Sequence, residues 1–273
     1  EVSETSGIIR VNGNVWTLND SGNSNQLYEL DGISGQLLRS IRVKNGGNFD
    51  WEALTRDDTY VYIGDVGNNN GLRKELKVYR FPLVELTNPQ TRQVIVDTIR
   101  YALPNQPRNY NPLLHNRDCE ALIAFQDSLY IFSKNRGNEF TYLYRIPNQP
   151  GRWVATYRES YEVVGEITAA SLDSSKTSLA LLGYRFHPRW RTNIPFIWLF
   201  QDFPKRNFFK GKAQRWDLEF RKQTEGLTWV GNTSQKWWVS YEQGNGIAPG
   251  LIELNLPFAS LEVPDSLSAD LIH

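Results

Sequence analysis

The strongest constraint on the fold is a pattern that the 273-residue chain repeats five times. Each copy reads as a short strand, a polar turn, and a second strand of aromatic or aliphatic residues that runs into Gly, Asn or charged residues. The copies are ETSGIIRVNGNVWTLNDSGN (from Glu4), DWEALTRDDTYVYIGDVGNN (from Asp50), DCEALIAFQDSLYIFSKNRGN (from Asp118), EITAASLDSSKTSLALLGYR (from Glu166) and QTEGLTWVGNTSQKWWVSYEQGN (from Gln223). Such internal repeats are typical of solenoids, propellers and arrays.

Further strands follow the copies. A third strand is expected after every copy, at Gln26–Leu30, Lys77–Phe81, Thr141–Ile146, Pro195–Phe200 and Leu251–Leu256. A fourth is expected after four of them, at Leu37–Val43, Val94–Leu103, Trp153–Val163 and Lys212–Glu219. Units of roughly 40–50 residues plus insertions predict an all-β fold, a β-propeller with five blades of four antiparallel strands around a central channel. A β-sandwich with accidental internal similarity is the alternative.

Residues 1–273 are expected to form a single β-propeller domain, a length that one such domain can reach. The longest unit contains a Pro- and Asn-rich insert, Pro104–Pro112, which we expect to form a loop over one face. The chain starts on an inner strand, so the last blade must take its outer strand from the tail, at Leu261–Val263, or go without one.

Composition excludes some classes of function. The formal net charge is zero, which argues against a nucleic-acid or membrane-surface binder. The longest apolar stretch, Ile194–Phe200, is too short to span a membrane. Cys119 is the only cysteine, so no internal disulfide can form. The chain begins at Glu1 and contains no Met, so we expect that a leading segment was removed; if that segment was a signal peptide, the protein is secreted, periplasmic or on the cell surface.

The inner strands of a propeller line its axis, so equivalent positions of the repeats form layers around it. One layer reads Ser6, Glu52, Glu120, Thr168 and Glu225, although Ser171 also fits the fourth copy. The layer two residues earlier reads Glu4, Asp50, Asp118, Glu166 and Gln223. Small residues follow the first layer, at Gly7, Ala53, Ala121, Ala169 and Gly226, and allow five strands to crowd together.

Converging carboxylates either raise one another's pKa or require a cation. Oxygen ligands without His or Cys favour Ca²⁺ over zinc or copper. We therefore predict a central Ca²⁺ site with the first layer, Ser6, Glu52, Glu120, Thr168 and Glu225, as ligands. A water-filled polar channel with some protonated carboxyls is the alternative.

The second strands end beside the first residues of the inner strands, which defines one mouth of the propeller. Their ends supply the candidate substrate-binding residues Asn19, Asn68, Lys134, Arg136, Arg185 and Glu242. The basic side chains among them could hold an anion above the acidic ring, and Asp20 or Asp65 could act as base for a water molecule. A cation beneath a basic rim suits phosphoryl transfer, which depends mostly on the placement of charge. Ordinary solvated turn residues that pair with Glu4 and Glu166 are the alternative.

The order hydroxyl, Glu, Glu, hydroxyl, Glu over five blades is similar to the calcium-activated nucleotidases, or apyrases. That resemblance implies a five-bladed propeller with a central Ca²⁺, and a substrate cleft lined by an acidic residue, here NDSG at 19–22, and by basic residues of the third and fourth blades. The run ETSG…WTLNDSGN…DWEALT…YIGDVGNN more closely resembles a group of exported propeller proteins of Bacteroidota, most of which have no assigned activity.

Three functions remain open. The sequence favours an exported or cell-surface propeller with a central Ca²⁺ site that acts as a binding or scaffold module. Its partner is a small anionic ligand, a protein or a glycan. The first alternative is a Ca²⁺-dependent hydrolase of phosphoanhydrides or phosphoesters. The second is a glycan-active enzyme, because inward-pointing acids can perform retaining or inverting hydrolysis according to their separation.

Overall fold

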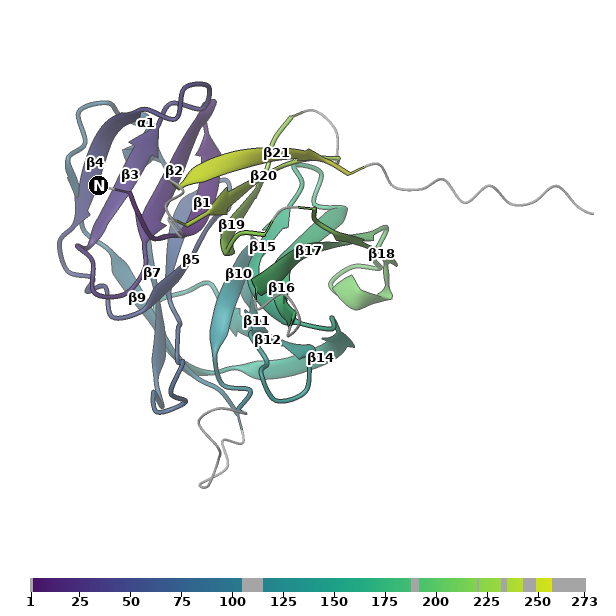
Figure 1. The fold of residues 1–273 in the computed structure, drawn as a ribbon. Helices are drawn as coiled ribbons and strands as arrows, with labels where there is room; N and C mark the ends of the chain where they lie inside the picture. The colour runs from purple at the N-terminus through teal and green to yellow at the C-terminus, as the bar shows by residue number, and fades with distance from the viewer. Residues whose placement is uncertain are drawn as a thin grey trace, which may run out of the picture.

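A computed structural model describes residues 2–104, 115–187, 192–219, 221–231, 235–242 and 249–256. Five sheets of mainly antiparallel strands stand around a common axis, so the predicted all-β class and five-bladed propeller are confirmed (Figure 1). The first strand of each sheet packs beside the first strand of the next sheet, and that of the fifth sheet returns to that of the first. This closed order places the N-terminal and C-terminal blades side by side, as the purple and yellow ribbons show (Figure 1).

The strand bounds follow the expected repeats closely. Blade 1 contains β1 (Thr5–Val11), β2 (Asn14–Asn19), β3 (Gln26–Leu30) and β4 (Leu37–Val43). Blade 2 contains β5 (Trp51–Arg56), β6 (Tyr60–Asp65), β7 (Leu76–Pro82) and β9 (Asp97–Ala102). Blade 3 contains β10 (Cys119–Phe125), β11 (Ser128–Ser133), β12 (Phe140–Pro147) and β14 (Thr156–Glu162). Blade 4 contains β15 (Glu166–Leu172), β16 (Ser178–His187), β17 (Thr192–Gln201) and β18 (Lys212–Asp217). Blade 5 contains β19 (Thr224–Trp229), β20 (Lys236–Tyr241) and β21 (Gly250–Asn255).

Two expected outer strands, Val94–Leu103 and Trp153–Val163, were wrong as single strands, because each divides between two blades. The short β8 (Gln93–Val94) pairs in parallel with β4 of blade 1, and β13 (Gly151–Val154) pairs in parallel with β9 of blade 2. After β8, the side chain of Asn45 hydrogen-bonds both the N–H and the carbonyl of Val96, which ends the first pairing before β9 begins. These exchanges tie neighbouring blades together at their outer edges.

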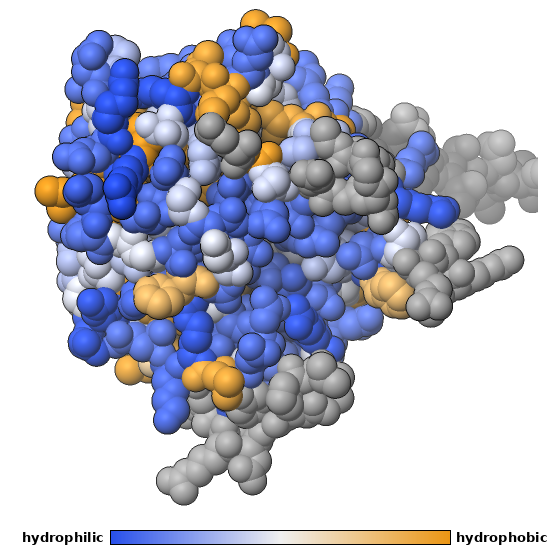
Figure 2. Space-filling view, turned by 60° about the vertical axis from the view of Figure 1, so that its left-hand side comes forward, coloured by the Kyte–Doolittle hydropathy of each residue, from blue (hydrophilic) through white to orange (hydrophobic). Residues whose placement is uncertain are grey.

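Little helix is present in the described residues. A four-residue helix, α1 (Val84–Thr87), and a short 3₁₀ turn, η1 (Phe208–Lys210), lie between strands. The predicted outer strand at Leu261–Val263 lies outside the described residues, as does most of the predicted loop at 104–112. Within the described residues, no helix is long and apolar enough to cross a membrane. Figure 2 shows a mostly hydrophilic face on which hydrophobic side chains form small separate groups.

All five inner strands carry an irregularity at the same place. The ladder between the first and second strand of each blade shifts by one residue between Thr5 and Gly7 and at the four equivalent positions. The extra residues of these bulges are Ser6, Glu52, Glu120, Thr168 and Glu225. A bulge re-aims one side chain and increases the local twist. The structure therefore makes these five positions equivalent, with Thr168 rather than Ser171 in blade 4.

Apolar side chains fill the wedges between blades. Four buried clusters join blades 1 and 2, 2 and 3, 3 and 4, and 4 and 5, around residues such as Trp51, Tyr101, Phe200 and Trp237. The junction of blades 5 and 1 is more polar. There Thr5 Oγ1 lies 2.6 Å from Thr17 Oγ1 and 3.4 Å from Ser240 Oγ.

The residues after the bulges must be small because the inner strands nearly touch. A Cβ added to Gly7 would lie 2.6 Å from the backbone nitrogen of Leu54 in the next blade. A Cβ added to Gly226 would lie 3.1 Å from the side chain of Ile8 in blade 1 and 2.2 Å from Ser240 Oγ in its own blade. The cavity left on the axis has a volume of only about 10 Å³, room for one water-sized sphere. The axis is a packed centre and not an open channel.

We predict that Gly7→Ala lowers the free energy of unfolding by about 1–3 kcal/mol, because the methyl group meets rigid backbone of the next blade. Denaturant titration measures the change. Gly47→Ala is the matched control, since the atoms nearest its Cβ belong only to the exposed side chain of Phe49. Equal stability of Gly7→Ala and the native protein would contradict the close approach at the axis.

Candidate functional site

The bulged residues form a buried ring near one end of the axis. Ser6, Glu52, Glu120, Thr168 and Glu225 are each at most 6% exposed. The hydroxyls lock neighbouring blades: Ser6 Oγ donates to the carbonyl of Trp51 at 2.6 Å, and Thr168 Oγ1 donates to the carbonyl of Thr224 at 2.8 Å. Each acceptor immediately precedes the Glu of the next blade. The two hydroxyl groups therefore hydrogen-bond blade 1 to blade 2 and blade 4 to blade 5.

Lys134, at the end of β11, enters this ring from blade 3. Its Nζ lies 2.7 Å from Glu120 Oε1, and both side chains are almost fully buried. Burial lowers the pKa of Lys134, but the carboxylates around it, Glu120 first, outweigh that effect and hold the pKa above its usual value. Lys134 therefore stays charged. Lys134 was predicted on the rim as an anion ligand, but it lies inside the ring, where it is the counter-ion of Glu120.

One lysine cannot neutralise three glutamates. Burial raises the pKa of Glu52, and the charges of Glu120 and Asp20 raise it further. Burial likewise raises the pKa of Glu225 to about 7 although Lys134 opposes the shift. The ring therefore holds protons as well as the ammonium group at neutral pH. The predicted five-residue Ca²⁺ ligand set stays a prediction, and a dication at its centre would compete with Lys134.

A denser carboxylate cluster lies one layer nearer the mouth. Oxygen atoms of Asp20, Asp50 and Glu52 lie within 4.8 Å of one another, and Asp20 and Asp50 are partly exposed. Burial raises the pKa of Asp50 to about 6, and the nearby charges of Asp20 and Asp118 add to the effect. Burial also raises the pKa of Asp20. Three hard oxygen donors at this spacing fit a divalent cation, and they do not fix which one.

Glu242 faces this cluster from blade 5. It follows β20, is partly exposed, and its backbone N–H donates to the carbonyl of Gln223 at 3.1 Å. Burial raises the pKa of Glu242 to about 8, and the charges of Glu225, Asp20 and Glu4 contribute in that order. Glu242 therefore keeps its proton at neutral pH, which makes it a proton donor at the mouth.

The other candidate acid and amide of blade 2 have structural contacts. Asp65 is fully buried, with Oδ1 2.8 Å from Arg73 Nη2, and it accepts the N–H of Asp50 at 3.1 Å. Asn68 is buried too; its N–H donates to Asp118 Oδ1 at 2.6 Å, and its side chain accepts the N–H of Arg73 at 2.8 Å. These contacts hold the loop after β6 in place, and neither side chain faces solvent.

The remaining rim candidates are divided between the mouth and its surroundings. Arg136 bridges blades 3 and 4, because its guanidinium lies 3.8 Å from Asp118 Oδ2 and 3.5 Å from Glu166 Oε2. Arg185 instead pairs at 3.5 Å with Asp217 on the outer strand β18. Asn19 is buried at the end of β2, beside the mouth. The structure thus brings Asp20, Glu242, Lys134 and the ring together, and it directs Arg185 outward.

Sequence reasoning did not assign a ligand role to Asp50 or any role to Arg73. Asp50 carried a signal, because it belongs to the second axial layer and lies two residues before Glu52. Arg73 carried none, since it lies in a loop outside the repeat and reaches Asp65 only in the folded chain.

Comparison with known proteins identifies the fold. No protein-family model matches the chain, and no curated protein matches it. Among solved structures, the catalytic domain of the Coprinopsis cinerea GH62 alpha-L-arabinofuranosidase is similar, with 13% identity, 93% of this chain and 91% of that chain covered, and a TM-score of 0.53. An exo-beta-1,3-galactanase from Phanerochaete chrysosporium with beta-1,3-galactotriose, in two variants, has 11% identity and TM-scores of 0.55 and 0.54.

This chain covers 61% of the galactanase chain, and 94% of this chain is matched. At such low identities the likeness establishes the five-bladed propeller and nothing more about activity. The resemblances to nucleotidases and to exported Bacteroidota propellers remain predictions.

We predict that Lys134→Met lowers the free energy of unfolding by about 3–5 kcal/mol at about pH 8, because a buried carboxylate loses its partner. Without the ammonium group the pKa of Glu120 rises in the folded state, so that variant regains stability as the pH falls and loses it as the pH rises. Denaturant titrations at about pH 8 and about pH 5 measure the difference.

The exposed pair Lys212–Asp202 provides the control. Lys212→Met should change stability by only about 0–1 kcal/mol at either pH. Adding Glu120→Gln to Lys134→Met should restore part of the loss at the higher pH. A double variant as unstable as Lys134→Met at both pH values would show that the charge pair is not the cause.

Proposed function

We propose that the chain is a glycan-active enzyme that hydrolyses glycosidic bonds at the acidic mouth of the propeller. One observation carries this proposal: three partly exposed carboxyls, Asp20, Asp50 and Glu242, meet at one mouth with different proton affinities. Glycoside hydrolysis needs a carboxylic acid that keeps its proton beside a carboxylate that has lost it.

Exposure and proton affinity assign the roles. Glu242, with its pKa raised to about 8, donates its proton to the leaving oxygen as the glycosidic C–O bond breaks. Asp20 lies across the mouth and takes a proton from the water that attacks the anomeric carbon, or attacks that carbon itself. Asp50 lies against Asp20, and the charge of Asp20 adds to the effect of burial in raising the pKa of Asp50. The ring glutamates are too deeply buried to touch a substrate.

The fold supports the same class of reaction. The similar solved structures are an arabinofuranosidase and a galactanase, and the proposal carries that class, glycoside hydrolysis, over to this chain. The glycan-active alternative of the sequence analysis therefore has more support than the binding module.

Phosphoanhydride hydrolysis fits the described residues less well. That reaction needs cations free to bind phosphate, but Lys134 pairs with Glu120, Arg136 with Asp118 and Glu166, and Arg185 with Asp217. The carboxyls that surround the mouth would also repel a polyphosphate.

We predict that the protein hydrolyses aryl alpha-L-arabinofuranosides or aryl beta-D-galactosides. Glu242→Gln and Asp20→Asn should each lower kcat by about 100-fold or more. The value of kcat/KM should fall above about pH 8, where Glu242 loses its proton. Release of the aryl group, followed over a pH series, measures both effects, and proton NMR of the first product gives the anomeric configuration.

Two exposed acids away from the mouth serve as controls. Glu253→Gln and Asp202→Asn should leave kcat unchanged, because both side chains are exposed and form ion pairs only with surface lysines, Lys236 and Lys212. A folded native protein that cleaves no member of a broad panel of aryl glycosides and polysaccharides would overturn the proposed activity.

A second candidate function is cation binding at Asp20, Asp50 and Glu52, favoured by their convergence within 4.8 Å. A divalent cation there would join blade 1 to blade 2 and offset the repulsion among the three acids. A binding or scaffold propeller at the cell surface, with such an ion holding its blades together, is the corresponding second proposal.

We predict that Ca²⁺ added to the chelator-treated protein raises its melting temperature, by about 2–4 °C for each kcal/mol of binding free energy. Asp50→Asn should abolish the shift because it removes a ligand, whereas Asp202→Asn should retain it. Differential scanning calorimetry with Ca²⁺, Mg²⁺ and Mn²⁺ compares the ions. An unchanged melting temperature with all three would exclude a divalent site at the mouth.

A further inference from the structure

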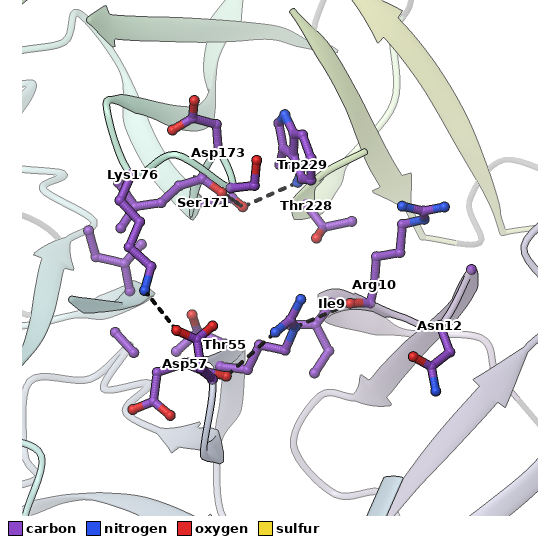
Figure 3. Close-up of a pocket in the computed structure, with 17 residues that line it drawn as sticks. Ile9, Arg10, Asn12, Thr55, Asp57, Ser171, Asp173, Lys176, Thr228 and Trp229 are labelled. Atoms are coloured by element: carbon purple, nitrogen blue, oxygen red, sulfur yellow. Dashed lines mark hydrogen bonds and ion pairs between the residues drawn. The ribbon is translucent and has the colours of Figure 1, made fainter. Parts of the chain in front are cut away.

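A second cavity lies at the other end of the propeller axis. Its volume is about 300 Å³, the lower end of the range for small-molecule sites. Each inner strand contributes the residue three positions after its bulge, and these residues are Ile9, Thr55, Ile123, Ser171 and Thr228. We call this cavity the axial basin. Figure 3 shows Trp229, Thr228, Ser171 and Asp173 on one side of it and Thr55 and Asp57 on the other.

The axial basin is separated from the acidic mouth. Between them, Ile8, Leu54, Leu122 and Leu227 line the small axial cavity below the ring, and all four are buried. A cavity of about 10 Å³ does not let a ligand through. Anything bound in the basin therefore occupies a site of its own, and the carboxyls of the mouth do not touch it.

Most charges of the axial basin are already compensated. Lys176 Nζ lies 3.4 Å from Asp58 Oδ2. Asp57 accepts two backbone N–H groups at 2.8 and 2.7 Å and the hydroxyl of Tyr62 at 2.7 Å. Asp173 accepts two backbone N–H groups, both at 2.9 Å, and the hydroxyl of Ser175 at 2.5 Å. The described residues of the lining include three basic and three acidic side chains, whose charges balance and select neither an anion nor a cation.

Hydrogen-bonding capacity remains in the axial basin beside an aromatic ring. Trp229 supplies the aromatic ring of the lining, whereas the guanidinium of Arg10 lies 5.8 Å from the centre of the Trp238 ring, outside the basin. Arg56 is exposed at the rim, with Nε 3.3 Å from the carbonyl of Arg10. The guanidinium of Arg56, the hydroxyls of the inner strands and the ring face of Trp229 together suit an uncharged ligand rich in hydroxyl groups.

We propose that the axial basin is a binding site for a neutral sugar residue, distinct from the mouth. The ring of the sugar packs on Trp229, and its hydroxyls accept from Arg56 and exchange hydrogen bonds with Thr55, Ser171 and Thr228. The site does no chemistry. It holds a glycan at the end of the axis opposite to the proposed hydrolytic site, and it stands on its own residues whether or not the mouth is catalytic.

Saturation-transfer NMR and calorimetry with neutral trisaccharides of xylose, arabinose, glucose and galactose test this site, with glucuronate and inorganic phosphate as charged comparators. The full chain carries Asp20→Asn, so that the sugars are not cleaved. Trp229→Leu and Arg56→Gln should each weaken sugar binding by about tenfold or more. Trp153→Leu, in the outer strand β13, is the matched control and should bind like its parent.

Arg56 is exposed, so Arg56→Gln keeps the test valid if Trp229→Leu does not fold. Neutral-sugar binding that survives Asp20→Asn and is lost in the basin variants would support the site. No binding up to about 20 mM, or binding unchanged in both basin variants, would overturn it. Tighter binding of glucuronate or phosphate than of every neutral sugar would overturn the assignment to an uncharged ligand. These binding measurements do not depend on catalysis, so they test the axial basin even if the protein has no glycosidase activity.

Discussion

The close approach of five inner strands around one axis is the constraint on which the rest of the structure depends. Two of these strands come so near that Gly7 has no room for a Cβ against the backbone of Leu54. Each inner strand has a one-residue bulge at the crowded position, immediately before a Gly or Ala residue. A bulge leaves one residue outside the regular pairing and turns its side chain. The positions that relieve the crowding are therefore the positions that aim polar side chains at the centre.

This geometry creates an electrostatic problem that the fold solves with its own side chains. Glu52, Glu120 and Glu225 converge in a buried ring, where unpaired charges are very unfavourable. Lys134 compensates one carboxylate directly, protonation reduces the remaining charge, and the hydroxyls of blades 1 and 4 bond across the blade junctions. A metal ion is thus not the only way to keep like charges together at this axis. The best place for an ion lies one layer outward, where Asp50 and Asp20 join Glu52.

The sequence predicted the parts of this structure that repeat. Five in-register copies gave the blade number, the inner strands and the ring residues, because each copy meets the same physical constraint. Prediction from the sequence failed for residues whose role depends on a contact that is not repeated in the other blades. Lys134 was expected on the rim, since the end of β11 lies there, but its long side chain turns inward to Glu120. Arg73, in an irregular loop, secures Asp65. Exchange of β8 and β13 between blades likewise depends on spatial neighbours that no local pattern reveals.

Depth along the axis decides what each carboxyl can do. The ring acids are shielded from solvent and do not touch a bound substrate, so their proton equilibria affect stability and, through the charge of Glu225, the pKa of Glu242. One layer out, Asp20, Asp50 and Glu242 combine partial burial with access to solvent, which is the combination that spreads pKa values and still permits proton transfer. Beyond the ring in the other direction, the apolar layer around Leu54 and Leu122 separates the basin from this charge. The basin can therefore keep a neutral, hydroxyl-lined surface although it lies on the same axis as the acidic mouth.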